Sequence, residues 1–215
     1  MRPVLLGIGG SRSGAGKTTV ACEILQNLSG WGAIKYTKTS LYGSITDDIK
    51  VLSEKGKDTK RFLDSGADKV LWVRAPFHEL PEILPIAVEM LSNFKGIIVE
   101  GNSAIDTLRP DIVIFVSGPE GKIKSGAERI LRMADIVVFD GQYTEQEYLT
   151  SRQGWGHSAC EHAIAAAQRN GVARLVLFHH DPQRTDEELD ALAENFDRSG
   201  DTEIIVAREG VEMTI

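Results

Sequence analysis

The chain has 215 residues, enough for one large domain or two modest ones with a packed core. Its composition, 42% apolar and 26% charged, is that of an ordinary globular protein and excludes a collagen-like, mostly disordered or disulfide-built chain. The net charge of −7 argues against nucleic acid as a main partner, because binding a phosphate backbone needs clustered lysine and arginine.

Charge is unevenly distributed along the chain. Residues 1–135 carry 18 Lys plus Arg and 16 Asp plus Glu, residues 136–215 carry 6 and 15, and no lysine follows Lys124. This break indicates two segments of different origin or role, although one domain with an acidic solvated face would look similar. We therefore expect a first domain at residues 1–135 and a C-terminal segment at residues 136–215.

Cysteine usage and hydropathy predict the compartment. With only Cys22 and Cys160 in the chain, a disulfide scaffold is not expected. No apolar run approaches the ~18 residues of a membrane span, and the apolar stretch at residues 4–9 is too short for a signal-peptide core. We expect a cytoplasmic protein with reduced thiols and no membrane association.

Short apolar runs alternate with helical patterns, which is typical of an α/β fold with a mainly parallel sheet covered by helices on both faces. The expected strands lie at residues 4–8, 32–36, 70–73, 96–99, 111–116, 135–139, 174–178 and 203–207. Apolar stripes at helical spacing predict one helix around residues 20–28 and another with Ile83, Ile86, Ala87, Met90 and Leu91 on its buried face.

Two helix starts are predicted in the second segment, which then forms a C-terminal α/β extension. Ser158 with Glu161, and Thr185 with Glu188, have the spacing of capping boxes, in which hydroxyl and carboxylate satisfy free backbone amides reciprocally.

The sharpest motif is GGSRSGAGKTT at residues 9–19, placed after the first strand and before the first helix. Small residues allow backbone amides to close around a phosphate, Lys17 adds a cation, and Thr18 offers a hydroxyl to Mg²⁺. This context predicts a P-loop NTPase fold. The expected nucleotide-binding residues are Ser13, Gly14, Ala15, Gly16, Lys17, Thr18 and Thr19.

Ser11 departs from the usual motif because it stands where the first glycine is expected. If that position needs a positive φ, serine is strained there, or the neighbouring Gly10 takes over the turn.

Further polar candidates lie at the ends of the predicted strands. Glu100 ends a buried strand, where it could hold Mg²⁺ or orient the attacking water, and an ordinary solvent-facing acid is an equal alternative. Asp58, Lys35 and Lys38 are additional candidates, with a solvated loop face as the alternative for both lysines.

The phosphate loop, with IKYT at residues 34–37, GKDTKR at 56–61, SGA at 65–67 and VEG at 99–101, resembles the molybdopterin-guanine dinucleotide biosynthesis protein B family over about residues 3–118. The resemblance implies a homodimeric GTP-binding P-loop protein with slow hydrolysis and an accessory role in attaching a nucleotide to molybdopterin. It implies Lys17, Glu100 and Asp58 as catalytic candidates, with Thr18 and Glu100 as Mg²⁺ ligands. Because no Asn-Lys-x-Asp motif is visible, GTP in preference to ATP rests on the resemblance alone.

The second segment carries a different likeness. DGQYT at residues 140–144, GWGHS at 154–158 and LFHHDP at 177–182 resemble the closing third of a metallo-β-lactamase-fold hydrolase, from about residue 134 to the C-terminus. The resemblance implies a second metal site in which Asp140 and His179 are ligands and His157 assists phosphodiester chemistry. The His-x-His-x-Asp-His cluster of such enzymes is absent from the sequence, so a self-contained two-metal hydrolase is not encoded. A single transition-metal site and a hydrogen-bonded remnant both stay open.

These observations lead to one main hypothesis and two alternatives. The main hypothesis is Mg²⁺-dependent binding and slow hydrolysis of GTP or ATP, accessory to molybdenum cofactor biosynthesis, with molybdopterin or a protein of that pathway as partner. One alternative is a metal-dependent phosphodiesterase whose missing ligands come from a partner chain. The other is a nucleotide-gated binding module without turnover.

Overall fold

The computed structural model describes residues 2–118, 123–196 and 198–210, and its contacts divide the chain into two compact units. Unit 1 consists of Met1–Gly10 and Gly16–Ile114, and unit 2 consists of Ser11–Ala15 and Phe115–Ile215. The expected boundary between residues 135 and 136, which separates segments of different charge and family likeness, stays a prediction.

Unit 1 is built on a mainly parallel sheet. Its strands are β1 (Val4–Gly10), β2 (Trp31–Lys38), β3 (Ser44–Thr46), β4 (Lys69–Ala75) and β5 (Gly96–Glu100). Their order is β3-β4-β2-β5-β1, and all pairs are parallel except β3 with β4. The next strand, β6 (Ile112–Ser117), contains the point at which the chain passes from unit 1 to unit 2.

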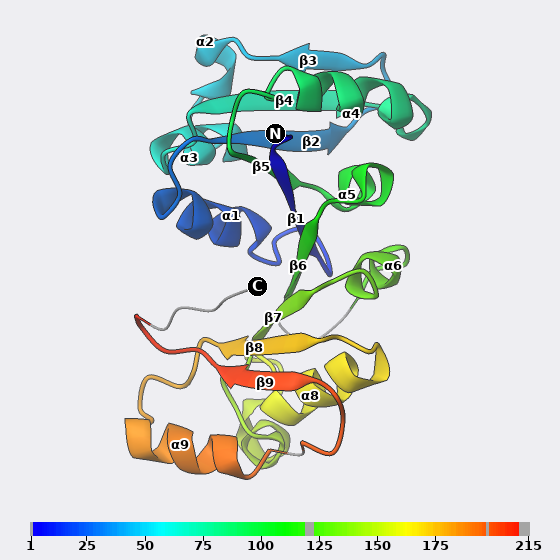
Figure 1. Ribbon diagram of the computed structural model, residues 1–215. Coiled ribbons are helices and arrows are strands. Elements are labelled where there is room, and N and C mark those ends of the chain that lie inside the picture. Colours follow the sequence, from blue (N-terminus) through cyan, green and yellow to red (C-terminus); the bar gives the residue numbers. More distant parts are fainter. Residues whose placement is uncertain (1, 119–122, 197, 211–215) are drawn as a thin grey trace. The chain divides into compact units, whose positions relative to one another are not determined.

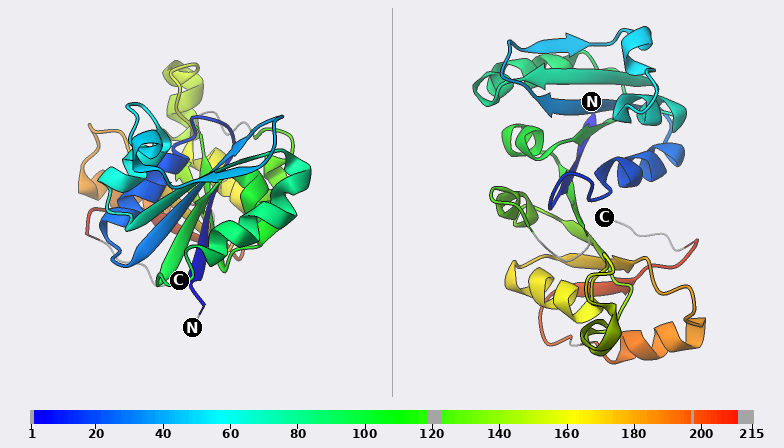
Figure 2. Two further views of the ribbon diagram at one scale, coloured as in Figure 1. Left: turned by 90° about the horizontal axis from the view of Figure 1, so that it is seen from above. Right: turned by 180° about the vertical axis from the view of Figure 1, so that it is seen from behind.

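Helices cover both faces of the sheet in unit 1. They are α1 (Lys17–Gln26), α2 (Ile49–Leu52), α3 (Asp58–Asp64), the short 3₁₀ helix η1 (Phe77–Glu79), α4 (Leu80–Glu89) and α5 (Asn102–Leu108). Figures 1 and 2 show α1 and α3 on one face and α4 and α5 on the other, and the helices of each pair contact each other.

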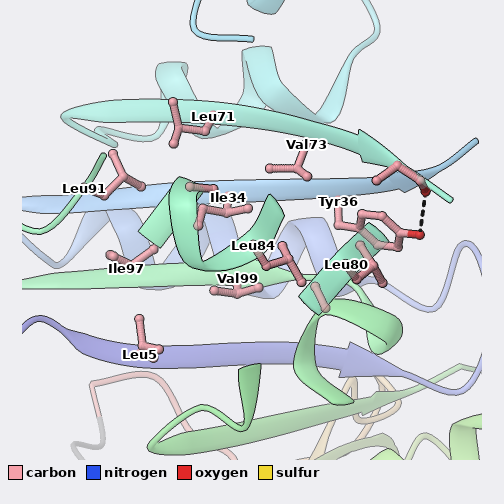
Figure 3. Packing of buried hydrophobic residues seen from close by; sticks show 13 residues of the cluster. Leu5, Ile34, Tyr36, Leu71, Val73, Leu80, Leu84, Leu91, Ile97 and Val99 are labelled. Carbon is pink, nitrogen blue, oxygen red and sulfur yellow. Dashed lines mark hydrogen bonds between the residues drawn. The ribbon is translucent and has the colours of Figure 1, made fainter. Parts of the chain in front are cut away.

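The alternation of side chains along the strands decides which residues meet which helices. Ile34 and Tyr36 of β2 point to the α4 face, where the Tyr36 hydroxyl donates to the Ala75 carbonyl at 3.0 Å (Figure 3). Lys35, which lies between them, therefore points to the α1 and α3 face. The buried cluster on the α4 face comprises Leu5, Ile34, Tyr36, Leu71, Val73, Ala75, Leu80, Leu84, Ala87, Leu91, Ile97, Val99 and Ala104.

The buried face of α4 differs from the predicted stripe. Leu80 and Leu84 are fully buried, whereas Ile86 is 56% exposed and Met90 42% exposed. Ala87 and Leu91 are buried and Ile83 packs against the core, as predicted, but the predicted stripe contained Ile86 and Met90 and omitted Leu80 and Leu84. The helix in fact begins at Leu80, with Pro81 in its first turn and Pro85 in its interior.

Unit 2 contains three parallel strands in the order β7-β8-β9, together with its own helices. Its elements are α6 (Ala127–Leu131), β7 (Ile136–Asp140), α7 (Glu145–Glu147), the π-helical turn η3 (Tyr148–Arg152), α8 (Cys160–Arg169), β8 (Arg174–Phe178), α9 (Asp186–Glu194) and β9 (Glu203–Val206).

One of the two predicted capping boxes is confirmed. Thr185 and Glu188 form the reciprocal pair at the start of α9. The prediction for Ser158 and Glu161 is wrong, because α8 begins one residue later with Ala159 as its N-cap, and the Glu161 carboxylate instead accepts from the Glu145 amide at 2.7 Å. A capping box formed by Thr144 and Glu147, which have the same three-residue spacing, was not predicted.

The predicted α/β architecture, a mainly parallel sheet with helices on both faces and a C-terminal α/β extension, is confirmed, and its assignment to the P-loop NTPases stays a prediction. The strand β3 and the short helices α2, α3 and α5 were not predicted. Among the described residues, no helix combines the length and apolar character that a bilayer crossing requires.

The burial along α4 leads to a stability prediction. Leu84→Ala should lower the free energy of unfolding by about 2–5 kcal/mol, because it opens a cavity in the core. Ile86→Ala, on the exposed side of the same helix, should change it by less than about 0.5 kcal/mol. Urea denaturation followed by circular dichroism measures both, and equal losses for the two variants would contradict the assigned helix face.

Candidate functional site

The loop that joins β1 to α1 has the backbone conformation expected of the glycine-rich motif. Gly14 (φ 76°) and Gly16 (φ 100°) both adopt left-handed conformations, which favour glycine. Gly16 is the N-cap of α1, and neither a capping side chain nor an acidic residue in the first turn engages the helix start. A glycine at the N-cap offers no side chain to the start of α1, which suits an anionic ligand there.

Ser11 replaces the first glycine of the motif without strain. Neither Ser11 nor Gly10 has a positive φ, so both expectations for this position are wrong. Instead Ser11 is fully buried, and its hydroxyl accepts a hydrogen bond from the Gly118 amide at 2.8 Å, within unit 2. The Ser11 amide donates to the Val116 carbonyl, and the Ser11 carbonyl accepts from the Lys124 amide. Serine thus supplies an acceptor that glycine lacks.

Asn102 fixes the last residue of β1 and was not predicted. Its side-chain oxygen accepts from the Gly10 amide at 2.9 Å, and its side-chain nitrogen donates to the Gly10 carbonyl at 2.9 Å. Asn102 follows Glu100 and Gly101 at the end of β5, so the run Glu-Gly-Asn after a buried strand was the available signal. The backbone N–H and the backbone carbonyl of Gly10 are thereby both satisfied by one side chain.

A polar cluster occupies the α1 and α3 face of the sheet in unit 1. The Thr18 hydroxyl donates to Glu100 Oε2 at 2.9 Å, and Lys35 Nζ lies 2.5 Å from Glu100 Oε1 and 2.5 Å from Asp58 Oδ2. The β2–β5 register pairs Lys35 directly with Glu100. Glu100 is 2% exposed, so the solvent-facing alternative for this residue is wrong, as is the solvated-loop alternative for Lys35. Lys38, by contrast, is exposed.

Asp58 is the more accessible of the two carboxylates, and its surroundings favour the charged form. Its partial burial alone would raise the pKa, but the hydrogen bond and charge of Lys35, the Thr18 hydroxyl and the charge of Arg61 outweigh burial and lower the pKa of Asp58 overall. A lowered carboxyl pKa stabilises the folded chain above the ordinary carboxyl pKa. This contribution is lost as the pH falls through the lowered value.

The donor set of this cluster fits magnesium. Thr18 supplies a hydroxyl oxygen and Glu100 and Asp58 supply carboxylate oxygens, which are the hard ligands that Mg²⁺ prefers. The ammonium group of Lys35 stands between the two carboxylates, so positive charge is already favoured at this point.

The remaining predicted loop residues differ in exposure. Ser13, Gly14 and Thr19 are exposed, Ala15 is buried, and Lys17 is half-buried. The Thr19 hydroxyl accepts from Arg61 at 3.0 Å, which ties the start of α1 to α3 within unit 1.

A second cluster lies in unit 2, where the resemblance placed a metal site. Asp140 ends β7, and its Oδ2 lies 2.9 Å from His157 Nδ1 and 3.0 Å from His179 Nδ1. The β7–β8 register pairs Asp140 with Phe178, so His179 follows at the same edge of the strands. His179 adopts a left-handed conformation with φ 61°, which is uncommon for a residue other than glycine.

The three side chains of this second cluster fit a single metal ion. One ligand atom from each lies within 4.8 Å of the others, and among the described residues no other group of three such side chains gathers in this way. Two imidazole nitrogens and a carboxylate oxygen form a donor set typical of zinc and similar ions. The Ser158 hydroxyl, 2% exposed, has no hydrogen-bond partner among the described residues.

No protein-family model matches the chain, and no curated protein matches it. Among solved structures, similarity is found to a nucleotide-binding protein from Archaeoglobus fulgidus in complex with ADP, with 14% identity, 90% of this chain and 89% of that chain covered, and a TM-score of 0.43.

Two further similar structures are plasmid partition proteins from Borrelia burgdorferi. One is 15% identical over 99% of this chain and 93% of that chain, with a TM-score of 0.35. The other, bound to AMPPNP, is 14% identical over 97% and 89%, with a TM-score of 0.36. At these scores no property of the three proteins is transferred to this chain.

The burial of Glu100 leads to the second prediction. Lys35→Met should lower the free energy of unfolding by about 3–5 kcal/mol, because it leaves a buried carboxylate without its cation. Combining Lys35→Met with Glu100→Gln should recover much of this loss, since the carboxylate then left without Lys35 is that of Asp58, whose side chain is 41% exposed. Urea denaturation of the single and double variants measures the coupling between the two side chains.

Lys60→Met is the matched control for this prediction. Lys60 pairs with Asp64 at 2.7 Å on the surface of α3, so its removal should cost less than about 1 kcal/mol. A Lys35→Met variant as stable as Lys60→Met would show that the buried pair does not hold the cluster together.

Proposed function

We propose that the loop at residues 13–19 binds a nucleoside triphosphate together with Mg²⁺ and that the chain hydrolyses it slowly. The observation that carries this proposal is the Thr18–Glu100 hydrogen bond of 2.9 Å at the first turn of α1. It joins the motif threonine to a buried strand-end carboxylate, directly after a glycine-rich loop with two left-handed glycines. A hydroxyl and a carboxylate in this relation provide oxygen ligands where a loop-bound phosphate would need its counter-ion.

Each residue has a defined role in this proposal. Backbone amides of Ser13, Gly14, Ala15 and Gly16 bind phosphate oxygens, and Lys17 stabilises their negative charge. Thr18 and Glu100 hold the Mg²⁺, and Asp58 completes the surroundings of the ion. Thr19 lies in the first turn of α1, next to the bound phosphates. The bound Mg²⁺ supplies charge neutralisation for the triphosphate.

Slow turnover is the expectation because both carboxylates that could orient a water molecule are engaged by Lys35. Hydrolysis then depends on a rearrangement or on a partner that completes the site. A nucleotide-gated binding module without turnover stays the alternative, and multiple-turnover release of phosphate distinguishes the two.

The finer assignment rests on the family resemblance over residues 3–118. It favours GTP as the nucleotide, a homodimer, and an accessory role in molybdopterin guanine dinucleotide biosynthesis, with molybdopterin or a protein of that pathway as partner. We propose a cytoplasmic protein that acts on neither nucleic acid nor membranes.

The third prediction concerns Lys17. Lys17→Ala should weaken nucleotide binding by about 10- to 100-fold, because one charge-assisted contact to the phosphates is lost. Isothermal titration with GTP and ATP, each with and without Mg²⁺, measures the affinity and the preferred base. Lys50→Ala, at an exposed position of α2, is the control and should bind as the original chain does. Equal binding by Lys17→Ala and Lys50→Ala would overturn the proposal.

A second candidate function is favoured by the geometry in unit 2. We infer that Asp140, His157 and His179 bind one transition-metal ion, because their ligand atoms lie within 4.8 Å of one another and the nearby buried Ser158 hydroxyl has no partner in the described part of the chain. Three protein ligands leave a coordination position open for water or substrate. A metal-dependent phosphodiesterase would need further ligands from a partner chain.

The fourth prediction tests this metal site. Co²⁺ titration followed by visible absorption should show one ion per chain, and His157→Ala or His179→Ala should weaken binding at least about tenfold. His162→Ala is the matched control, since His162 is 46% exposed and pairs with Glu145 at 3.3 Å. Two outcomes would contradict the metal site and leave the three residues as a hydrogen-bonded cluster only. In one, His162→Ala reduces the absorption as strongly as the other variants; in the other, neither His157→Ala nor His179→Ala alters it.

A further inference from the structure

A small cleft adjoins the polar cluster of unit 1 on the side of Lys35 and Asp58. Its volume is about 210 Å³, and it is lined by side chains of β2, β4 and the start of α3. Lys35 belongs both to the cluster and to the cleft lining, because its ammonium contacts Glu100 and Asp58 while its side chain borders the cleft. The cleft and the proposed Mg²⁺ ligands therefore share one cation.

Cations gather around the indole ring in the cleft wall. The Trp72 Nε1 donates to the Thr37 hydroxyl at 3.0 Å, which fixes the ring. Lys57 Nζ lies 4.5 Å from the ring centroid, and the guanidinium carbon of Arg74 lies 4.6 Å from it. Cation–π contacts of this kind hold positive groups next to a partly exposed apolar surface. Among the described residues, the buried Arg74 Nε has no hydrogen-bond partner.

Positive charge already exceeds negative charge in and around the cleft when no metal is bound. Three cations, Lys35, Lys57 and Arg74, stand near three carboxylates: Asp58, Glu100 and Glu54, the last of which pairs with Lys57 at 2.7 Å. Arg61, whose charge also acts on Asp58, adds one further positive charge. A divalent cation on Glu100 and Thr18 would increase this excess by two.

Lys35 and Mg²⁺ compete for the same carboxylate oxygens. The ammonium holds Glu100 Oε1 and Asp58 Oδ2 at 2.5 Å each, and these oxygens belong to the ligand set proposed for the ion. Once a divalent ion neutralises the carboxylates, the attraction that holds Lys35 between them weakens. The lysine already borders the cleft, so a short movement of its side chain presents the ammonium to an anion there.

We propose that this cleft is a second ligand site, selective for a small phosphate monoester, and that Lys35 couples its affinity to the occupation of the metal site. A phosphate monoester carries a charge of about −1.5 to −2 at neutral pH, which offsets the positive charge that the metal adds. Lys35 and Lys57 bind its oxygens, Thr37 offers a hydroxyl, and Trp72 packs against the organic part. The inference rests on the proposed function, because it takes Thr18 and Glu100 as the metal ligands.

Phenyl phosphate is a suitable probe because it combines a phosphate monoester with a small apolar group. Its binding to the full chain is measured by isothermal titration in EDTA and again in excess Mg²⁺, without nucleotide and at matched ionic strength. We expect about tenfold tighter binding with Mg²⁺, within the usual range of coupling between two sites. By thermodynamic reciprocity, saturating phenyl phosphate should tighten Mg²⁺ binding by the same factor. This reciprocal measurement needs no variant, and an unchanged Mg²⁺ affinity overturns the coupling.

Variants then separate the cleft from the phosphate loop. Trp72→Leu and Lys57→Met should each weaken binding of phenyl phosphate, whereas Lys17→Ala should leave both the binding and its Mg²⁺ dependence intact. Trp155→Leu is the matched control, because Trp155 is an exposed tryptophan with Arg152 4.4 Å above its ring. Lys35→Met should abolish the difference between EDTA and Mg²⁺. Binding that only Lys17→Ala removes would assign the probe to the loop and overturn the proposal.

Two further arms test the ligand class and the independence of the result. Benzoate, a singly charged carboxylate of similar shape, should bind more weakly than phenyl phosphate in Mg²⁺, and equal binding would overturn the selectivity for phosphate. If GTP and ATP fail to bind while phenyl phosphate binds with the expected Mg²⁺ dependence, the nucleotide assignment fails and the cleft assignment stands. The reverse result overturns the cleft alone.

Discussion

The ammonium of Lys35, held between the carboxylates of Glu100 and Asp58, is the interaction on which the organisation of unit 1 depends. Glu100 is almost completely buried at the end of β5, and an unpaired carboxylate there would be strongly destabilising. The β2–β5 register brings Lys35 beside it, and Asp58 at the start of α3 occupies the other side of the ammonium. Two strands and two helices are thereby tied to a single charged centre, since Thr18 of α1 bonds to the same Glu100.

This arrangement is the physical basis of the metal and anion sites proposed above. A buried carboxylate with one lysine and one hydroxyl has its hydrogen bonds satisfied, yet its cation is a side chain that can move rather than a fixed metal. At the proposed metal site, a divalent ion would replace an existing charge interaction instead of creating a new buried one. The cost of desolvating Glu100 has already been met in folding, so the proposed site would be organised before its ion arrives.

The sequence was informative where a local pattern decides the structure. The predicted strands, the glycine-rich loop between β1 and α1 and the capping box at Thr185 each follow from residues within a few positions of one another, and the structure contains them. The predictions fail where the deciding contact is distant in sequence, or where neighbouring residues compete for the same position in a helix. Ser158 could not cap α8 because Ala159 takes that place, and Ile86 and Met90 of the predicted stripe on α4 are exposed because Leu80 and Leu84 lie on the buried face.

The candidate site shows the same division between local and distant signals. Lys17, Thr18 and Glu100 were recognisable from the loop motif and the buried strand. The joint contact of Lys35 with Asp58 and Glu100 depends on strand order, because Lys35 and Glu100 are 65 residues apart and meet only when β2 and β5 are neighbours. For Ser11, strain or a turn at Gly10 was expected if the position needs a positive φ, because the motif position was judged by its backbone alone, whereas the buried Ser11 hydroxyl bonds to an amide of a residue 107 positions away.

The two polar clusters follow one structural rule and differ in chemistry. In each, a carboxylate ends a buried parallel strand and the register of the neighbouring strand supplies its partner: Lys35 for Glu100, and His179 for Asp140. Unit 1 adds a hydroxyl and a second carboxylate, giving oxygen donors with a resident ammonium, which favours a hard divalent ion. Unit 2 adds His157, giving nitrogen donors that favour a borderline metal. The two proposed sites therefore differ in donor type because the side chain that meets the carboxylate at each strand end differs.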